Sequence, residues 1–359
     1  MNSVRAMRHL GLLAAASLWL LAMASAAAAQ PPLEEPYDTG WAFYVDNDVL
    51  SPNGGDRDYT GGFSLTLSGR RARDAWWSLD GLRGSVDHVL RLDSLYADRE
   101  LTRHSVETGV TIFNPGSINV PEKQVGDRPY AGLVYFAHTA VEVEPVRDLA
   151  YVSTLTLGVL GLPIVGDAQK ALHRAIGSPQ PVGWENQISN GGEPTFRYAF
   201  ARVKRSWAGE LAGVDGELTT TWRASVGYIT EASYGVATRF GAFRTPWWSY
   251  NPQIAEYAEK SVPVVASEGG GSEHYFWGGV NLKARAYNAF LQGQFRESAV
   301  TFSSSELNHV LAEGWLGYTW ATAGGWRFSY VLRAQSAEVR TGPANHVETW
   351  GGLILSYAL

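Results

Sequence analysis

Apolar and polar residues alternate along much of the chain after residue 30. Between residues 326 and 333, for example, Trp326, Phe328, Tyr330 and Leu332 alternate with mostly polar neighbours. A period of two is typical of a β-strand with one apolar face, because successive side chains of a strand point to opposite sides. We count about twelve such segments, near residues 41–49, 59–69, 104–113, 129–143, 149–160, 195–206, 217–229, 233–242, 275–293, 307–321, 325–339 and 347–358.

A soluble β-sandwich would show the same alternation, but two other features favour a membrane barrel. The chain has 14 Trp and 17 Tyr, many of them near predicted strand ends, where a barrel has aromatic girdles at the membrane interface. The polar rows hold Arg, Glu, Gln, Ser and Thr, which suit a polar lumen better than a dry core. We therefore predict an all-β fold, an antiparallel transmembrane β-barrel of about twelve strands, with a short helix in an external loop.

Strand parity predicts where the connections lie. If the chain enters the barrel from the periplasm, residues 50–58, 114–128, 161–194, 294–306 and 340–346 lie outside the cell. The inner connections should be short turns, and residues 322–325 fit this expectation. Residues 70–103 and 243–274 do not, because each insertion is about thirty residues long. Neither insertion carries a pattern that predicts a function.

The N-terminus has the three parts of an export signal. Arg5 and Arg8 precede an apolar stretch, and Ala27–Ala29 offer a small-residue cleavage site before Gln30. We expect residues 1–29 to be removed as a signal peptide and residues 30–359 to form a single barrel domain in the outer membrane. The rest of the chain has no apolar run of the ~18 residues that a membrane-spanning helix needs.

Charge and cysteine content exclude several classes of protein. The formal net charge is −6, and the acidic residues are dispersed, so no basic face is available for nucleic acid. The chain has no Cys, which excludes disulfide scaffolds, thiolate metal sites and Cys nucleophiles.

An acidic cluster at the junction of the first two predicted strands is the first candidate for chemistry. Asp46-Asn47-Asp48 is followed by Asp56-Arg57-Asp58, with Gly54 and Gly55 between them. Carboxylate and amide oxygens are the hard ligands that calcium prefers. The alternative is a solvated loop that needs Asp and Gly for its turns.

The second candidate lies on a predicted helix at residues 167–177. Asp167 can cap its start, Gly177 can end it, and the apolar residues Ala168, Ala171, Leu172, Ala175 and Ile176 form one stripe. Gln169 and His173 are four residues apart and share another side. Histidine is the side chain best suited to take a proton from water near neutral pH. The alternative is a surface histidine on a packing helix. His104 and His138, both in predicted strands, are less suited to act as bases.

Three ordered motifs extend these candidates. They are Val45-Asp46-Asn47-Asp48 with Asp56–Gly62, Phe113-Asn114-Pro115 with Gly126–Gly132, and Gln169–Gly177 with Trp184–Ile188. Together they resemble the outer-membrane lipid A 3′-O-deacylase family (LpxR-like). The resemblance implies a twelve-stranded barrel that removes the 3′-linked acyloxyacyl chain of lipid A with calcium. The implied partners are lipid A or lipopolysaccharide as substrate and the lipids of the outer membrane; we expect a monomer.

The resemblance also implies roles for individual residues. His173 would activate a water that attacks the ester carbonyl, and Ca²⁺ held by Asn47 and Asp48 would stabilise the oxyanion. Thr60 would add a hydroxyl to the catalytic group. The nearest counterpart of a substrate-binding lysine of the family is Lys123. A tyrosine of the family falls on Pro181, which cannot donate a side-chain hydrogen bond.

Two other functions remain open on the sequence alone. An outer-membrane phospholipase with a Ser nucleophile would also be a barrel, although the chain has no Gly-x-Ser-x-Gly elbow. A non-enzymatic barrel that serves as a pore or scaffold belongs to a different class and would need no catalytic histidine.

Overall fold

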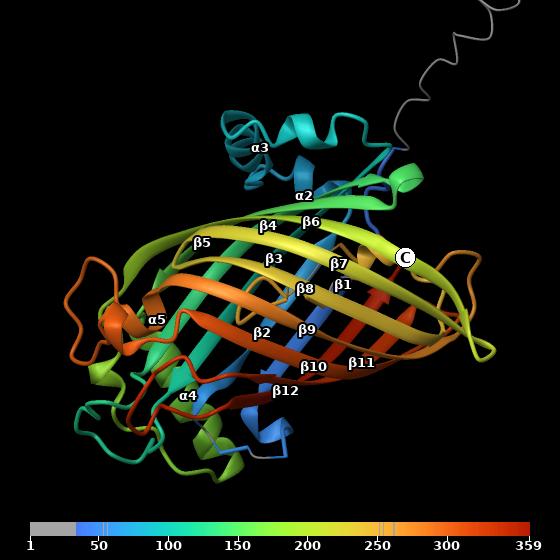
Figure 1. The fold of residues 1–359 in the computed structure, drawn as a ribbon. Helices are drawn as coiled ribbons and strands as arrows, with labels where there is room; N and C mark the ends of the chain where they lie inside the picture. Colours follow the sequence, from blue (N-terminus) through green and yellow to red (C-terminus); the bar gives the residue numbers. More distant parts are fainter. Residues whose placement is uncertain (1–33, 53, 56, 251, 254, 261–262) are drawn as a thin grey trace, which may run out of the picture. The chain divides into compact units, whose positions relative to one another are not determined.

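Twelve antiparallel strands close into a barrel in the computed structural model, which describes residues 34–359 except 53, 56, 251, 254, 261 and 262 (Figure 1). Residues Glu35–Leu359 form one compact unit, separate from Met1–Glu34. The predicted signal peptide at residues 1–29, and Asp56 of the acidic cluster, lie outside the described residues.

Each strand pairs with its neighbours in sequence, and β1 pairs with β12 to close the sheet. The strands are β1 (Gly40–Asn47), β2 (Asp58–Ser68), β3 (Leu101–Asn114), β4 (Ala131–Glu144), β5 (Leu149–Leu160), β6 (Glu193–Leu211), β7 (Val214–Gly227), β8 (Ile229–Ala242), β9 (Glu273–Asn288), β10 (Val310–Ala321), β11 (Trp326–Gln335) and β12 (Glu348–Ala358).

The predicted all-β fold, an antiparallel barrel of twelve strands, is confirmed. Two strand ends differ from the prediction by five residues: β6 runs on to Leu211, and β9 ends at Asn288, where residues 289–292 form the short helix α5 (Ala289–Gln292). The Asn288 side chain accepts a hydrogen bond from the Phe290 N–H at 3.0 Å and so caps this helix. The cap that Asn288 provides for α5 therefore ends β9, although the apolar pattern of the sequence continues beyond this residue.

The strands of the wall turn polar side chains toward the lumen and apolar side chains outward, which is the reverse of the arrangement in a soluble protein. On β2, Ser64, Thr66 and Ser68 are fully buried toward the lumen. Phe63 and Leu65 point outward and are 51% and 40% exposed. Because an exposed apolar row on a closed sheet matches a lipid environment, this alternation is that of a membrane barrel.

The inner insertion between β8 and β9 fills the lumen. It contains the 3-10 helix η5 (Trp247–Ser249), and its residues Tyr257 and Ala258 pack in the core with strand residues. Glu256 and Glu259 form ion pairs with Arg197 and Arg223 of the wall at 2.7–3.2 Å. Burial raises the pKa of the Glu256 carboxyl, but Arg197, Arg223 and Lys283 outweigh this effect and hold the pKa well below its usual range.

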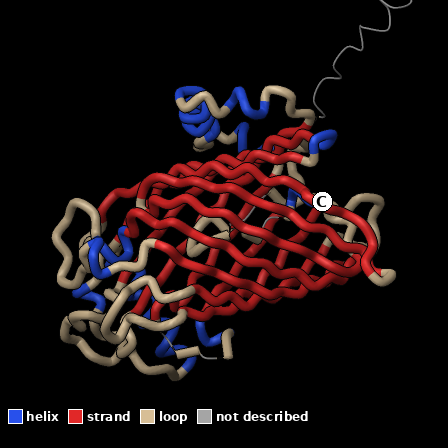
Figure 2. The backbone as a smooth tube through the Cα atoms, viewed as in Figure 1, coloured by secondary structure: helices blue, strands red, loops and turns tan. Residues whose placement is uncertain are grey.

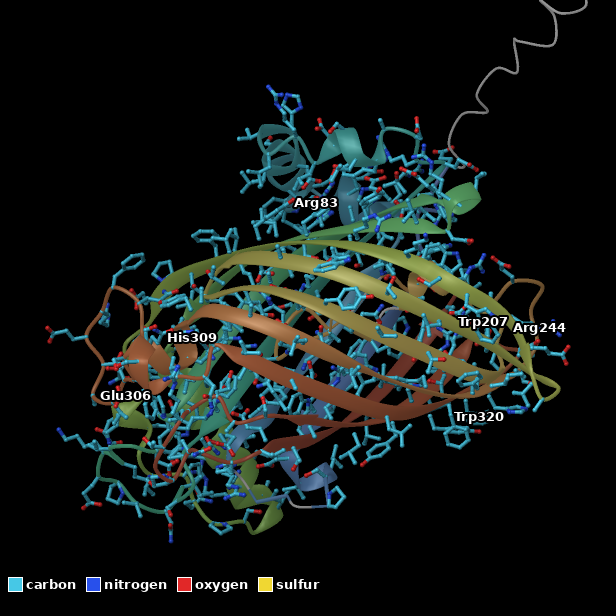
Figure 3. All side chains as sticks on the ribbon, in the orientation of Figure 1. Arg83, Trp207, Arg244, Glu306, His309 and Trp320 are labelled. Atoms are coloured by element: carbon cyan, nitrogen blue, oxygen red, sulfur yellow. The ribbon has the colours of Figure 1, made fainter. Side chains whose placement is uncertain are left out.

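The inner insertion between β2 and β3 folds back over the outside of the wall (Figure 1). It contains α2 (Arg70–Asp74), α3 (Asp80–Val89) and η2 (Asp93–Tyr96). Leu133, Tyr135 and Ala137 of β4 pack in the core, so the alternation puts His138 on the outer face, where α3 contacts β4 and β5. Arg83, labelled in Figure 3, lies on the buried side of α3. Among the described residues, no helix is both long and apolar enough to span a membrane.

Connections at the opposite end carry most of the remaining helical segments. These are η1 (Asp48–Leu50), α4 (Pro163–Ile176), η4 (Trp184–Asn186) and η6 (Ser304–Glu306), whereas η3 (Pro145–Arg147) lies in the inner turn between β4 and β5. In Figure 2, α4 and α5 lie at one end of the strands, and the turn that joins β10 to β11 lies at the other end. The residues that the sequence singles out for chemistry come from this α4 end, which strand parity places outside the cell.

Candidate active site

The helix α4 is the one predicted in an external loop, but it starts a turn earlier than expected. Pro163 occupies its first position, where no backbone N–H is needed and the fixed φ of proline suits a helix. Asp167 therefore lies inside the helix, and the prediction that it caps the start was wrong. Gly177 ends the helix with a φ of 74°, as predicted, because an L side chain would be strained there.

The buried side of α4 is its polar side. Gln169 and His173 are each only 4% exposed, which confirms that they share one face. Leu172 and Ile176 from the predicted apolar stripe are 56% and 64% exposed. The stripe thus faces away from the protein, as expected for a helix at the edge of a lipid leaflet.

The turn after α4 fixes the state of His173. The carbonyl of His173 accepts the N–H of Ser178 at 2.9 Å, so the chain reverses and brings Pro179 beside the imidazole. His173 Nδ1 lies 2.6 Å from the carbonyl oxygen of Pro179. A carbonyl oxygen can only accept, so Nδ1 carries the proton and Nε2 holds the lone pair of the neutral ring.

Close packing holds α4 against the outside of the barrel. Val165 lies against Gly132 of β4, where an added Cβ would come within 2.8 Å of the Val165 side chain. Gln169 Oε1 accepts the indole N–H of Trp184 at 2.8 Å, and Trp184 packs on the Tyr130 ring with centroids 5.0 Å apart. The helix is therefore a fixed part of the outer rim above β3 and β4.

Asn47 and Asp48 lie where β1 ends at the same rim. Asn47 belongs to the outward-pointing row of Phe43 and Val45. The side-chain Oδ1 atoms of Asn47 and Asp48 both accept the N–H of Val49 at 2.8 Å, and Asp48 Oδ2 accepts the N–H of Arg57 at 2.8 Å. Because two Oδ1 atoms share one donor, they lie close together and offer a pair of hard oxygen ligands.

Thr60 lies one position from Gly61, which is the register partner of Asn47. It falls at an irregularity in the pairing of β2 with β3, between Tyr59 and Gly61. Thr60 is 4% exposed, and its hydroxyl has no hydrogen-bond partner among the described residues. A bulge that re-aims a side chain is common beside active sites.

Other buried polar atoms near this end also have no partner in the described part of the chain. They are both side-chain atoms of Asn114, Gln169 Nε2 and Gln187 Oε1. Buried polar groups nearly always find a partner, so such a set indicates that a polar ligand or water completes the site. Asn114 and Gln187 belong to the motifs along the chain, but the sequence alone predicts no role for them. Only their burial, which the sequence does not show, singles them out.

Lys123 lies on the loop between β3 and β4, where its side chain is exposed. It lines a small cavity with Tyr130, Gly183 and Asn186. Two backbone-directed hydrogen bonds of 2.9 Å tie this loop to the segment after α4, from Val182 N–H to Ile118 O and from Asn186 Nδ2 to Pro121 O. Lys123 is thus brought beside the loop that carries Pro179.

A family model described as outer membrane protein LpxR matches residues 12–359. The chain belongs to the LpxR family. This finding confirms the resemblance based on the three motifs, and the protein is an outer-membrane protein. A comparison with curated protein sequences finds no significant match.

One solved structure agrees with the fold of this LpxR-family protein. LpxR from Salmonella typhimurium is 19% identical, with a TM-score of 0.68, over 89% of this chain and 100% of that chain. The translocator domain of the autotransporter NalP from Neisseria meningitidis is 8% identical, with a TM-score of 0.39, over 97% of this chain and 96% of that one.

Proposed function

We propose that this LpxR-family protein is a lipid A deacylase that hydrolyses the 3′-linked acyloxyacyl ester in the outer leaflet. The observation that carries the proposal is the hydrogen bond from His173 Nδ1 to Pro179 O, at 2.6 Å. It leaves Nε2 as the basic nitrogen of a histidine on the outer rim. Family membership supports the same conclusion independently.

In this mechanism His173 Nε2 removes a proton from a water molecule, whose oxygen forms a bond to the ester carbonyl carbon. The carbonyl of Pro179 keeps accepting from Nδ1 and stabilises the imidazolium that forms. His173 then returns the proton to the sugar oxygen as its bond to the acyl carbon breaks. The products are a free fatty acid and a sugar hydroxyl, so no other reactant is needed.

The oxygen donors at the rim fit a calcium ion. Asn47 and Asp48 would hold it, because their side chains supply only hard oxygens and the buried Thr60 hydroxyl beside them has no protein partner among the described residues. When bound, calcium supplies a Lewis acid that polarises an ester carbonyl. Thr60 donates its hydroxyl to the substrate and so orients the ester.

The surroundings of the site suit a lipid with an anionic headgroup. Ile164, Leu172 and Ile176 of α4 are at least half exposed, and they can contact acyl chains from the outer leaflet. Lys123, on the neighbouring loop, can bind a phosphate of lipid A. A cavity in the lumen has a volume of about 120 Å³, well below the roughly 300–1,000 Å³ of ordinary ligand sites. The substrate therefore binds at the rim and not in the lumen.

The alternatives have less support. The ion-paired insertion that fills the lumen is unsuited to a pore. A serine phospholipase would need a Ser–His pair, and Ser304 Oγ does lie 3.1 Å from His309 Nε2 at the outer end. However, Nε2 also faces the Ser304 carbonyl at 3.0 Å and Nδ1 faces the Arg285 carbonyl at 2.8 Å. Both ring nitrogens thus face carbonyl oxygens, which can only accept, so neither is placed to take the proton of Ser304.

Mass spectrometry of lipid A from cells that carry the wild type, His173→Gln or Ser304→Ala tests the proposal. We expect loss of the 3′-linked acyloxyacyl chain with the wild type and with Ser304→Ala, but not with His173→Gln. Intact lipid A in wild-type cells, and in detergent assays with calcium, would refute deacylation. Loss of activity in Ser304→Ala alone would favour the phospholipase.

A further inference from the structure

A second group of potential ligands lies far from the outer rim, between the helical insertion and the outer wall. Asp80 begins α3, His104 lies near the start of β3, and His138 lies in the middle of β4. One ligating atom from each residue lies within 4.8 Å of the other two. We propose that Asp80, His104 and His138 bind a divalent transition metal of the zinc class, which fastens α3 to the barrel.

The distances between the ligating atoms fit one small ion. Asp80 Oδ1 lies 3.7 Å from His104 Nε2 and 3.5 Å from His138 Nε2. Tetrahedral zinc, with bonds of about 2.0–2.2 Å, separates its ligand atoms by roughly 3.4 Å. The two distances from Asp80 are within a few tenths of an ångström of this value, and the ligating nitrogens of His104 and His138 lie within 4.8 Å of each other.

A polar partner at Nδ1 orients each of the two imidazole rings, those of His104 and His138. Glu35 accepts from His104 Nδ1 at 2.6 Å and from the His104 backbone N–H at 2.6 Å. Ser78 Oγ lies 3.3 Å from His138 Nδ1 and can accept its proton. With Nδ1 protonated, Nε2 of each ring keeps the lone pair that a metal requires. A carboxylate behind a ligating histidine is a frequent arrangement in metal sites.

The burial of His138 and the lack of a hydrogen-bond partner for its Nε2 among the described residues independently indicate a ligand. Its side chain is fully buried, and Nε2, which faces Asp80, has no hydrogen-bond partner among the described residues. An unpaired buried nitrogen is costly, and a bound ion would remove this cost. Asp80 also accepts from Arg83, through Nε at 3.1 Å and Nη2 at 2.7 Å. Both bonds go to Oδ1, so the second carboxylate oxygen, Oδ2, keeps its acceptor positions and can bind a metal after a rotation of the Asp80 carboxylate.

The donor set selects the class of metal. Two imidazoles and one carboxylate suit zinc and its neighbours, whereas calcium prefers oxygen ligands alone. The Asp80 side chain is 23% exposed, so water can reach the ion from that side and complete four-coordination. The site is thus distinct in place and in chemistry from Asn47 and Asp48.

The consequence is structural. Two ligands belong to neighbouring strands of the wall and the third begins α3, so the ion would join the insertion to the barrel. Binding to the folded state alone stabilises that state. We expect the insertion to be held by the metal, and deacylation at the opposite end not to depend on it.

The test uses the full folded barrel in detergent micelles, stripped with a chelator and then dialysed free of it. We expect the wild type to bind about one equivalent of Zn²⁺ at this site, to show visible absorption with Co²⁺, and to unfold at a higher temperature with Zn²⁺. His104→Gln and His138→Gln should lose all three effects. His88→Gln is the matched control, because His88 lies on α3 with an 81% exposed side chain.

A milder variant keeps the test valid if a ligand variant misfolds. Glu35→Gln leaves all three ligands in place and should weaken zinc affinity by about 10–100-fold, the usual effect of losing such a support. Asp48→Asn should leave zinc binding unchanged, which separates this site from the proposed calcium site. A wild type that binds no Zn²⁺, or equal binding and Co²⁺ spectra in the wild type and His138→Gln, would overturn the proposal.

Discussion

His173 Nδ1 lies 2.6 Å from the carbonyl oxygen of Pro179, across the turn that Gly177 closes at the end of α4. A backbone carbonyl here takes the position that a carboxylate has in many hydrolases, and it orients the ring without adding a negative charge. The proposed base and its support therefore come from one short segment, so the geometry of the turn would control the proposed chemistry.

Replacement of the base gives the first prediction. His173→Gln should lower the rate of deacylation by about 10²–10⁴-fold, the usual contribution of general base catalysis. The substitution preserves a polar side chain on the buried face, so the barrel should fold with unchanged heat-modifiable mobility on gels. Rates measured on purified protein by the release of fatty acid check this, and near wild-type release would require a different base.

The support of the base gives the second prediction. Gly177→Ala forces an L side chain into a left-handed conformation at a φ of 74°, a cost of about 1–2 kcal/mol. If the turn shifts to relieve the strain, Pro179 leaves His173 and deacylation falls. Gly177→Asn should retain most activity, because asparagine tolerates this conformation. Gly84→Ala is the control, since Gly84 has a negative φ and open space around it. Equal activity in all three variants would show that the turn does not position the base.

The twelve strands could be predicted from the sequence because lipid outside and a polar lumen inside impose a period of two on each strand. The orientation of α4 on the barrel could not be predicted from the sequence. Its apolar stripe, Leu172 and Ile176 included, does not by itself show which way it faces; the surroundings outside the barrel are lipid, and the polar face is the buried one. The rule that apolar residues lie inside fails where the surroundings are apolar.

The sequence also could not predict which residues that are distant along the chain lie together in the fold. Asp80 and His138 are separated along the chain by β3 and the connection that follows it, and only the folding of α3 onto the outer wall brings them together. Motifs in order along the chain did identify the candidate rim residues, because Asn47 and Thr60 flank one turn. A site assembled by long-range packing leaves no local pattern.

The metal requirement at the rim is the third prediction. A calcium-selective chelator should abolish deacylation, and added Ca²⁺ should restore it. Mg²⁺ should restore it poorly, because it demands stricter geometry. Asp48→Asn keeps the size of the side chain but removes its charge, so it should raise the Ca²⁺ concentration needed for half-maximal activity. Full activity with calcium shown to be absent would remove the ion from the mechanism.

Lys123 gives the fourth prediction, about substrate binding. If it binds a phosphate of lipid A, Lys123→Ala should raise KM with little change in kcat, since a remote charge stabilises substrate and transition state equally. The loss should be smaller at high salt, which screens an exposed charge. Lys170→Ala, on the neighbouring helix, is the control. A fall in kcat at unchanged KM would place Lys123 in the chemical step instead.

The luminal insertion gives the last prediction, about stability. Glu256 lies between Arg197, Arg223 and Lys283 at 2.7–3.5 Å, and Glu256→Gln would remove one counter-charge from these buried cations. Glu259 and Glu313 would remain as their other partners. Breaking such a network typically costs about 3–5 kcal/mol. The pKa of Glu256 is depressed in the folded protein, so its contribution is present above the unfolded pKa and is lost as pH falls through the folded pKa.

The free energy of unfolding in urea, measured in detergent micelles across pH, should therefore differ most between wild type and Glu256→Gln at neutral pH. The difference should narrow only in strong acid, where the wild-type carboxyl also takes up a proton. Glu268→Gln is the control, because Glu268 belongs to the same insertion and is exposed. If Glu256→Gln unfolds like Glu268→Gln at neutral pH, the ion pairs do not hold the insertion in the lumen. Packing around Tyr257 would then be the main interaction that keeps the barrel filled.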